Sequence, residues 1–249
     1  MQNLVQYIYG IADNALILGQ RLGELCGHGP NLETDIAMTN IALDLLGQTR
    51  SYYQYAAKLT GGNATEDTIA FLRSEREYKN VLLVEQPNTD FAYSIGRQFL
   101  YDVFHLLMLQ ELQNSTDPTL SAIAKKSIKE VSYHQRFSSD WIRRLGDGTE
   151  ESHDRMQTAI NDLWTFTDEL FHQTDADKLM AIANIGVDVT MLREAYFAIV
   201  LAILTEATLE IPDLKYFQKG GKLGIHSEHM GYLLADMQYM QRTFPNMQW

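Results

Sequence analysis

Carboxylate and imidazole side chains three residues apart on a helix lie on one face, where they can bind a metal ion together. Helical bundles that bind two irons use this spacing, since two helices each supply Glu-x-x-His and two others each supply a Glu. Asp102 and His105 have this spacing in a helical, largely apolar stretch. The alternative for a single such pair is an exposed hydrogen-bonded pair, so the remaining ligands must decide between the two.

The remaining ligand pairs are incomplete. His134 lies on an apolar stripe, but the residue three positions before it is Val131, and Gln48 stands where a histidine is expected, three after Leu45. Neither hydrocarbon can coordinate iron. At the same spacing, Glu130 is followed by Tyr133, and Asp44 by Gly47. We therefore predict a degenerate di-iron site, without metal and without catalytic residues, at Leu45, Gln48, Asp102, Val131 and His134.

An alternative function and a question about the centre of the site remain open at this point. The first is an active di-iron oxygenase or oxidase, which would have to use Asp102, His105, Glu130 and His134. The second concerns the centre of the degenerate site, where Asp44, Asp102 and His134 could form a hydrogen-bonded network, because buried charges must be paired.

Two further clusters lie near the end of the chain. His226 and His229 are spaced three apart, but without a third converging ligand such a pair is more typical of capping and packing. The segment Lys219–Gly224, KGGKLG, is basic and rich in glycine. Such a loop can hold an anion on its backbone N–H groups, but it lacks the ending of a nucleotide-binding loop. The alternative is a flexible connection.

The elements that must position these residues are helices. Apolar residues recur every three or four positions along four long stretches, which predicts four helices with one buried face each, as in a four-helix bundle. No alternation of period two predicts a strand. Asp117 and Pro118 form a helix start. Shorter helices are predicted at 66–85, as a crossover between the second and third long helices, and at 150–172, 189–210 and 226–243. We predict one domain, residues 1–249.

The composition excludes several classes of function. The net charge is -12, from 32 acidic and 20 basic residues, so a broad nucleic-acid-binding surface is not expected. The single cysteine, Cys26, cannot build a disulfide framework. No signal peptide is recognisable, and the longest apolar run, residues 196–204, is too short to span a membrane. We predict a cytoplasmic protein without a membrane segment.

Several long segments carry a resemblance to a known family. They are ADNALILGQRLGELCGHGP, NIALDLLGQTR, FLRSEREYKNVLLVEQPNTDFA, KSIKEVSYHQRFSSDWIRRLGDGT, INDLWTFTDELF and KGGKLGIHSEHMGYLLADMQYMQR. In this order and over nearly the whole length, the chain resembles the PaaC family of subunits of phenylacetyl-CoA 1,2-epoxidase, which acts in phenylacetate degradation. The resemblance implies a ferritin-like fold, with the four-helix bundle, the crossover helix and additional C-terminal helices.

The resemblance also implies a role. The epoxidase adds one oxygen atom of O2 to the ring of phenylacetyl-CoA, the di-iron centre lies in a related catalytic subunit, and a reductase component supplies electrons from NADPH. A subunit of this family is non-catalytic, has no cofactor, forms a hetero-oligomer with the catalytic subunit and self-associates when alone. A share in binding the coenzyme A part of the substrate carries over to Glu77, Tyr78, Lys79, Asn80, Lys178, Leu179 and Met180. The alternative for these positions is an ordinary solvated surface.

Overall fold

The computed structural model describes residues 1–245 and residue 247, and all regular elements among them are helices. Helices make up 73% of the structure, and the described residues form no strand. The prediction of an all-α, ferritin-like fold is therefore confirmed. None of the described helices is both long enough and apolar enough to cross a membrane.

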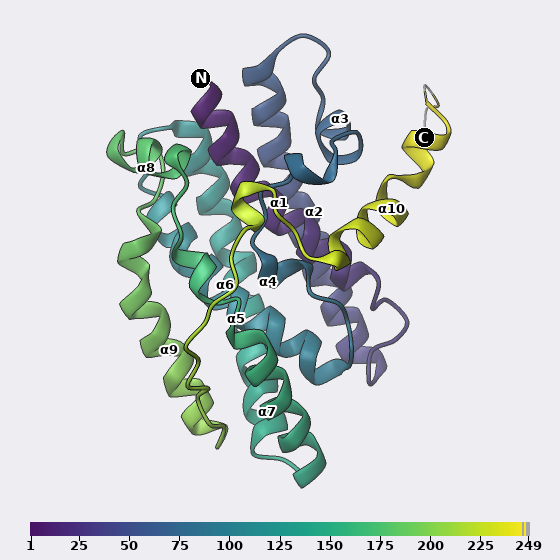
Figure 1. Cartoon of the computed structure of the whole chain (residues 1–249), viewed down its shortest axis with the longest axis vertical. Helices are drawn as coiled ribbons and strands as arrows, with labels where there is room; N and C mark the ends of the chain where they lie inside the picture. The colour runs from purple at the N-terminus through teal and green to yellow at the C-terminus, as the bar shows by residue number, and fades with distance from the viewer. Residues whose placement is uncertain (246, 248–249) are drawn as a thin grey trace. The chain divides into compact units, whose positions relative to one another are not determined.

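The chain divides into two compact units. One contains residues 1–85 and 220–249, and the other contains residues 86–219. Each unit contains one pair of long helices that follow each other in the sequence (Figure 1). The assignment of residues 1–249 to a single domain stays a prediction.

The first unit is built on α1 (Gln2–Gly23) and α2 (Leu32–Thr60), which pack along each other. The Asn31 side chain caps α2 by accepting a hydrogen bond from the amide of Thr34 at 2.9 Å, which satisfies an amide that has no partner within the helix. The apolar residues of these two helices form the buried face of the pair, and this face includes Ile8, Ile17, Leu18, Leu22, Ile41 and Tyr52. Burial of each large aliphatic side chain contributes about 1.5–3 kcal/mol.

The predicted crossover helix at 66–85 is wrong. The segment contains α3 (Glu66–Phe71), the 3-10 turn η1 (Glu75–Glu77) and α4 (Leu82–Glu85). Between η1 and α4 the backbone is extended, with φ -76° and ψ 148° at Tyr78. Several amides and carbonyls of this segment bind side chains of other elements, so they are not free to pair with one another in a helix.

The last part of the chain returns to the first unit through the 3-10 turn η4 (Gly221–Leu223) and α10 (Glu228–Thr243). Helix α10 contacts α1, α3 and η1. The predicted helix at 226–243 is confirmed apart from its first two residues, and helix ends commonly differ by this much.

The second unit is built on α5 (Phe91–Leu112) and α6 (Pro118–Gly146). Asp117 caps α6 by accepting hydrogen bonds from the amides of Thr119 at 2.9 Å and Leu120 at 3.0 Å. Pro118 occupies the first turn, where its missing N–H costs nothing. The predicted start of this helix is therefore confirmed.

Three shorter parts of the second unit differ from the predictions. The helix predicted at 150–172 is α7 (Glu150–Trp164) followed by the turn η2 (Asp168–Phe171), because the carbonyl of Trp164 accepts both the amide and the hydroxyl of Thr167. The helix predicted at 189–210 is the turn η3 (Val189–Leu192) followed by α9 (Arg193–Glu206). Thr208 has a φ of 59°, which ends α9. Helix α8 (Asp175–Ile182) was not predicted.

Candidate functional site

The acid and the two histidines nominated as metal ligands in the second unit are all buried. Asp102 and His105 on α5 are 0% and 1% exposed, and His134 on α6 is 0% exposed. The alternative of an exposed Asp102–His105 pair is therefore wrong. The carboxylate of Asp102 accepts hydrogen bonds from Gln98 Nε2 at 2.6 Å and from Ser138 Oγ at 2.8 Å.

Burial shifts the pKa values of this cluster toward the neutral forms. Burial raises the pKa of Asp102 to about 7, although the charge of His134 and the hydrogen bonds from Ser138 and Gln98 act in the opposite direction. Burial and, second, the charge of His134 lower the pKa of His105 to about 3. His105 is therefore a neutral imidazole at neutral pH, and Asp102 is partly protonated.

The donor atoms present do not fit a di-iron centre. Val131 is a fully buried hydrocarbon on α6, while Tyr133 is 39% exposed and Glu130 is also partly exposed, so neither supplies the missing inward oxygen. Among the described residues, no group of three or more His, Cys, Asp and Glu side chains is arranged to hold a metal ion. The absence of a metal in the protein itself stays a prediction.

The other two positions of the predicted degenerate site lie in the first unit. Leu45 and Gln48 on α2 are 0% and 3% exposed, so both lie on the buried face of that helix as predicted from the spacing. Asp44, the third member of the proposed hydrogen-bonded network, is partly exposed. That network stays a prediction.

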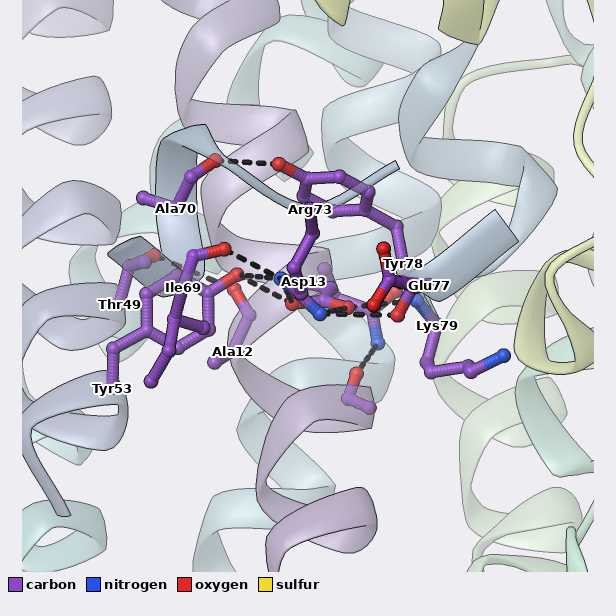
Figure 2. A network of polar contacts seen from close by, with 12 residues as sticks. Ala12, Asp13, Thr49, Tyr53, Ile69, Ala70, Arg73, Glu77, Tyr78 and Lys79 are labelled. Atoms are coloured by element: carbon purple, nitrogen blue, oxygen red, sulfur yellow. Dashed lines mark hydrogen bonds and ion pairs between the residues drawn. The ribbon is translucent and has the colours of Figure 1, made fainter. Parts of the chain in front are cut away.

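A second polar cluster, which the sequence reasoning missed, lies inside the first unit (Figure 2). Asp13 on α1 is 0% exposed, and it meets the guanidinium of Arg73, which is 8% exposed. Two nitrogens of Arg73 donate to the two carboxylate oxygens at 2.6 and 3.0 Å. The hydroxyl of Tyr53 and the amide of Lys79, the latter at 2.7 Å, also donate to Asp13. The buried charge is thus paired and fully hydrogen-bonded, which burial requires.

Arg73 also organises the backbone around it. Its Nε donates to the carbonyl of Ile69 at 2.7 Å and one terminal nitrogen donates to the carbonyl of Glu77 at 3.1 Å (Figure 2). The guanidinium carbon lies 4.2 Å from the ring centre of Tyr78 and 4.6 Å from that of Tyr9. The Arg73 bonds occupy carbonyls, and the bond from Lys79 to Asp13 occupies an amide, that a continuous helix would pair internally. This explains why the predicted helix is broken here.

The pKa values in this cluster favour the ion pair. Burial alone would lower the pKa of Arg73, but the charges of Asp13 and Tyr53 and the hydrogen bond to Asp13 together outweigh it, and the net shift is upward. Burial, and next the charge of Asp13, raises the pKa of the Tyr53 hydroxyl. Burial also raises the pKa of Tyr78 to about 12. At neutral pH both tyrosines are therefore neutral donors, and Arg73 keeps its charge.

The coenzyme A positions nominated at 77–80 differ in their exposure and in their hydrogen-bond partners. Tyr78 and Asn80 are 0% exposed, and their side-chain donors bind within the protein: the Tyr78 hydroxyl donates to Ala70, and the Asn80 amide donates to Glu85 at 3.0 Å. Glu77 is exposed, but its carboxylate accepts from the amide and hydroxyl of Ser74, both at 2.7 Å. The Lys79 ammonium donates to a backbone carbonyl at 3.1 Å and stays half-buried.

The positions nominated at 178–180 lie on α8 in the second unit, on a solvated face. Lys178 forms an i, i+3 pair with Asp175 at 3.6 Å, and its side chain is 56% exposed. Leu179 is 46% exposed, and Met180 is half-buried. The assignment of all seven positions to coenzyme A binding stays a prediction.

The glycine-rich segment is not the flexible connection considered as one alternative, whereas the packing role expected for the late histidines fits His226. A Cβ on Gly221 would collide with the carbonyl oxygen of Asn80, and a Cβ on Gly224 would collide with that of Arg76. The loop is therefore packed closely on residues 76–82, which does not fit a flexible connection. His226 and His229 do not converge, since the ring of His226 binds Glu85 whereas the backbone of His229 accepts from Arg21.

Comparison with known proteins identifies a family over the full length of the chain. The profile of the family described as phenylacetic acid catabolic protein matches residues 1–249. This chain belongs to that family. The C subunit of 1,2-phenylacetyl-CoA epoxidase from Escherichia coli (strain K12) is 50% identical over 249 residues, which cover 100% of both chains. The family resemblance read from the sequence is therefore confirmed.

Proposed function

We propose that this chain is a non-catalytic subunit of the epoxidase, which binds and supports a di-iron catalytic subunit. The observation that carries the proposal is the pair of buried hydrocarbons, Leu45 and Val131, at positions where iron requires carboxylates. The partial exposure of Glu130 and Tyr133 supports it, because neither side chain supplies an inward oxygen in place of Val131. In this proposal the di-iron cofactor lies in the partner, and NADPH acts through the reductase component.

Exposed apolar side chains indicate where the catalytic subunit would bind. Leu32, Ile36 and Leu43 on α2 are 70%, 50% and 60% exposed, and their spacing of four and seven places them on one face of the helix. We call these three residues the α2 stripe. Stable obligate interfaces bury more than about 2,000 Å² and are rich in apolar side chains. Among the exposed residues of α2, the stripe supplies such side chains.

The mixing experiment tests this proposal directly. The chain and the catalytic subunit, mixed at micromolar concentration, should elute together. The matched variants Leu43→Asp and Met191→Asp should differ in their affinity for the catalytic subunit. Met191 is an equally apolar residue, 77% exposed, in η3 rather than on α2. We expect Leu43→Asp to weaken the complex at least tenfold and Met191→Asp to leave it unchanged. Separate elution of the unmodified proteins contradicts the proposal.

Iron analysis separates the proposal from the alternative oxygenase. After anaerobic loading with Fe²⁺ and desalting, we expect close to zero iron per chain. About two irons per chain, lost on substitution of Asp102 or His134, would establish the active di-iron enzyme instead.

We further propose that Lys79 and Lys178 contact the phosphates of phenylacetyl-CoA in the complex, since ammonium groups commonly bind phosphate. Cytoplasmic localisation is part of the same proposal. The test is the KM of the assembled epoxidase for phenylacetyl-CoA with Lys79→Met or Lys178→Met in this subunit. A rise in KM at constant kcat supports the contact, and unchanged values for both variants exclude it.

A further inference from the structure

The side chain of His226 forms a buried ion pair in the first unit. Its Nδ1 lies 2.8 Å from Glu85 Oε2, and its Nε2 lies 3.1 Å from the backbone carbonyl oxygen of Tyr78. Both side chains of the pair are 0% exposed. Each ring nitrogen therefore faces an oxygen that can only accept a hydrogen bond from it, provided the Glu85 carboxylate is ionised.

The carboxylate of Glu85 is the acceptor in both of its other contacts. Asn80 Nδ2 donates to Oε2 at 3.0 Å, and the amide of Ser227 donates to Oε1 at 2.6 Å. A neutral imidazole has one N–H and one lone pair, so one of its nitrogens would place a lone pair against an oxygen. Beside an ionised Glu85, only the doubly protonated imidazolium satisfies both contacts.

The charges around His226 come from four elements. Glu85 lies on α4, Glu75 lies on η1, and Arg21 on α1 donates to the carbonyls of Glu85 and His229. Glu228 and His229 follow on the same segment as His226. Burial alone lowers the pKa of His226, but the hydrogen bond to Glu85, its charge and the bond to Tyr78 outweigh burial, so the pKa is raised above 6.5.

We propose that His226 is a proton-dependent latch, which as an imidazolium fastens Gly220–Gly224 and the start of α10 to residues 78–85. The segment that it fastens is closely packed, since Gly221 and Gly224 lie against backbone carbonyls of residues 76–82. Gly224 also lies beside the ammonium of Lys79. Loss of the proton on His226 would turn one of its two contacts repulsive and loosen the loop from Lys79.

The sign of the pH dependence follows from the raised pKa. The latch contributes its full stabilisation below pH 6.5, where the unfolded histidine is also protonated, and loses it as pH rises through the higher midpoint of the folded state. Between these two values, each pH unit changes the opening equilibrium of the latched segment by at most about tenfold.

The first test is the protonation state of His226 in the intact chain, from the ¹⁵N shifts of the imidazole rings, with the signal assigned by its loss in His226→Asn. We expect both ring nitrogens of His226 to be protonated at pH 6.5, and its midpoint to lie above that of His28, an exposed histidine near a single acceptor. A neutral ring at pH 6.5, or a midpoint at or below that of His28, overturns the proposal.

The second test is hydrogen exchange of the α10 amides, corrected for intrinsic exchange and compared with α7 in the same molecule. Opening of α10 should increase with pH through the His226 midpoint, by up to tenfold per unit, while α7 stays constant. In His226→Asn, which can donate to Glu85 without charge, α10 should open more at pH 6.5 and lose this pH dependence; His28→Asn should behave as the unmodified chain. An α10 that opens equally at all pH values in the unmodified chain refutes the latch. Neither test involves the catalytic subunit, so the latch can fail while the proposed function stands.

Discussion

Replacement of Arg73 by methionine tests whether the Asp13–Arg73 pair stabilises the first unit. Methionine keeps most of the volume of the side chain but removes every donor, so Asp13 would remain as a buried carboxylate with only Tyr53 and the Lys79 amide as partners. Removal of one partner of a buried ion pair costs about 3–5 kcal/mol. Because a folded protein is stable by only about 5–15 kcal/mol, we expect Arg73→Met to remove a large share of the free energy of unfolding.

The matched control is Arg50→Met. Arg50 forms an ion pair with Glu66 at 3.5 Å, but its side chain is 72% exposed, and exposed pairs contribute about 0–1 kcal/mol. Urea unfolding followed by circular dichroism at 222 nm measures both variants. If the free energy of unfolding of Arg73→Met stays within about 1 kcal/mol of that of Arg50→Met, the inference that this pair organises the first unit is refuted.

A double-mutant cycle separates the pair from its surroundings. Asp13→Asn and Arg73→Met are each expected to destabilise, but the combined variant should cost less than their sum, since the second change no longer leaves a buried charge alone. Coupling energies of neighbours in one network are about 0.5–3 kcal/mol. Strict additivity would show that the two side chains act independently, despite their contact at 2.6 Å.

Two further predictions concern other parts of the protein. The pKa of Asp102 is about 7 in the folded state against an ordinary 3.8, so its contribution to stability falls as pH rises between these values. The pKa of His105 is about 3 in the folded state against 6.5, so its contribution to stability rises with pH between these values. The two contributions oppose each other between about pH 4 and 6.5. Asp102→Asn should therefore unmask a stability that rises with pH by up to about 1.4 kcal/mol per unit in urea titrations; an unchanged pH profile would contradict the assigned shifts. Gly221→Ala should destabilise the protein by more than about 2 kcal/mol through its clash with the Asn80 carbonyl, whereas Gly10→Ala, in α1 with open space around it, should stabilise it by up to about 1 kcal/mol. Melting temperatures of the two variants that shift in the same direction would be inconsistent with the packing of the loop.

The long helices could be predicted from the sequence because their determinants are local. The apolar spacing of α5 and α6 repeats within each helix, and Asp117 caps amides only two and three residues away, next to Pro118 in the first turn. The same locality explains why Leu45 and Val131 could be read as buried. Each lies on a helix face that its own neighbours define.

The segment 66–85 could not be predicted because its determinants are distant. Asp13 is 60 residues from Arg73, and Glu85 is 141 residues from His226. The available signal was a charged residue, Asp13, within the most apolar stretch of α1, since a buried carboxylate implies a cation elsewhere in the fold. That signal predicts the existence of a partner but not its identity, and so it cannot show where a helix will be broken.

The buried carboxylates of the two units, Asp13 and Asp102, have different partners, and this difference is relevant to the proposed function. In the first unit, Asp13 meets a guanidinium that stays charged at every accessible pH. In the second unit, Asp102 meets neutral donors and a histidine, and burial raises its pKa to about 7. A buried carboxyl that accepts hydrogen bonds from neutral donors is a good internal hydrogen-bonding group. In the proposed function, this cluster would stabilise the pair of α5 and α6 rather than bind iron, as a supporting subunit requires.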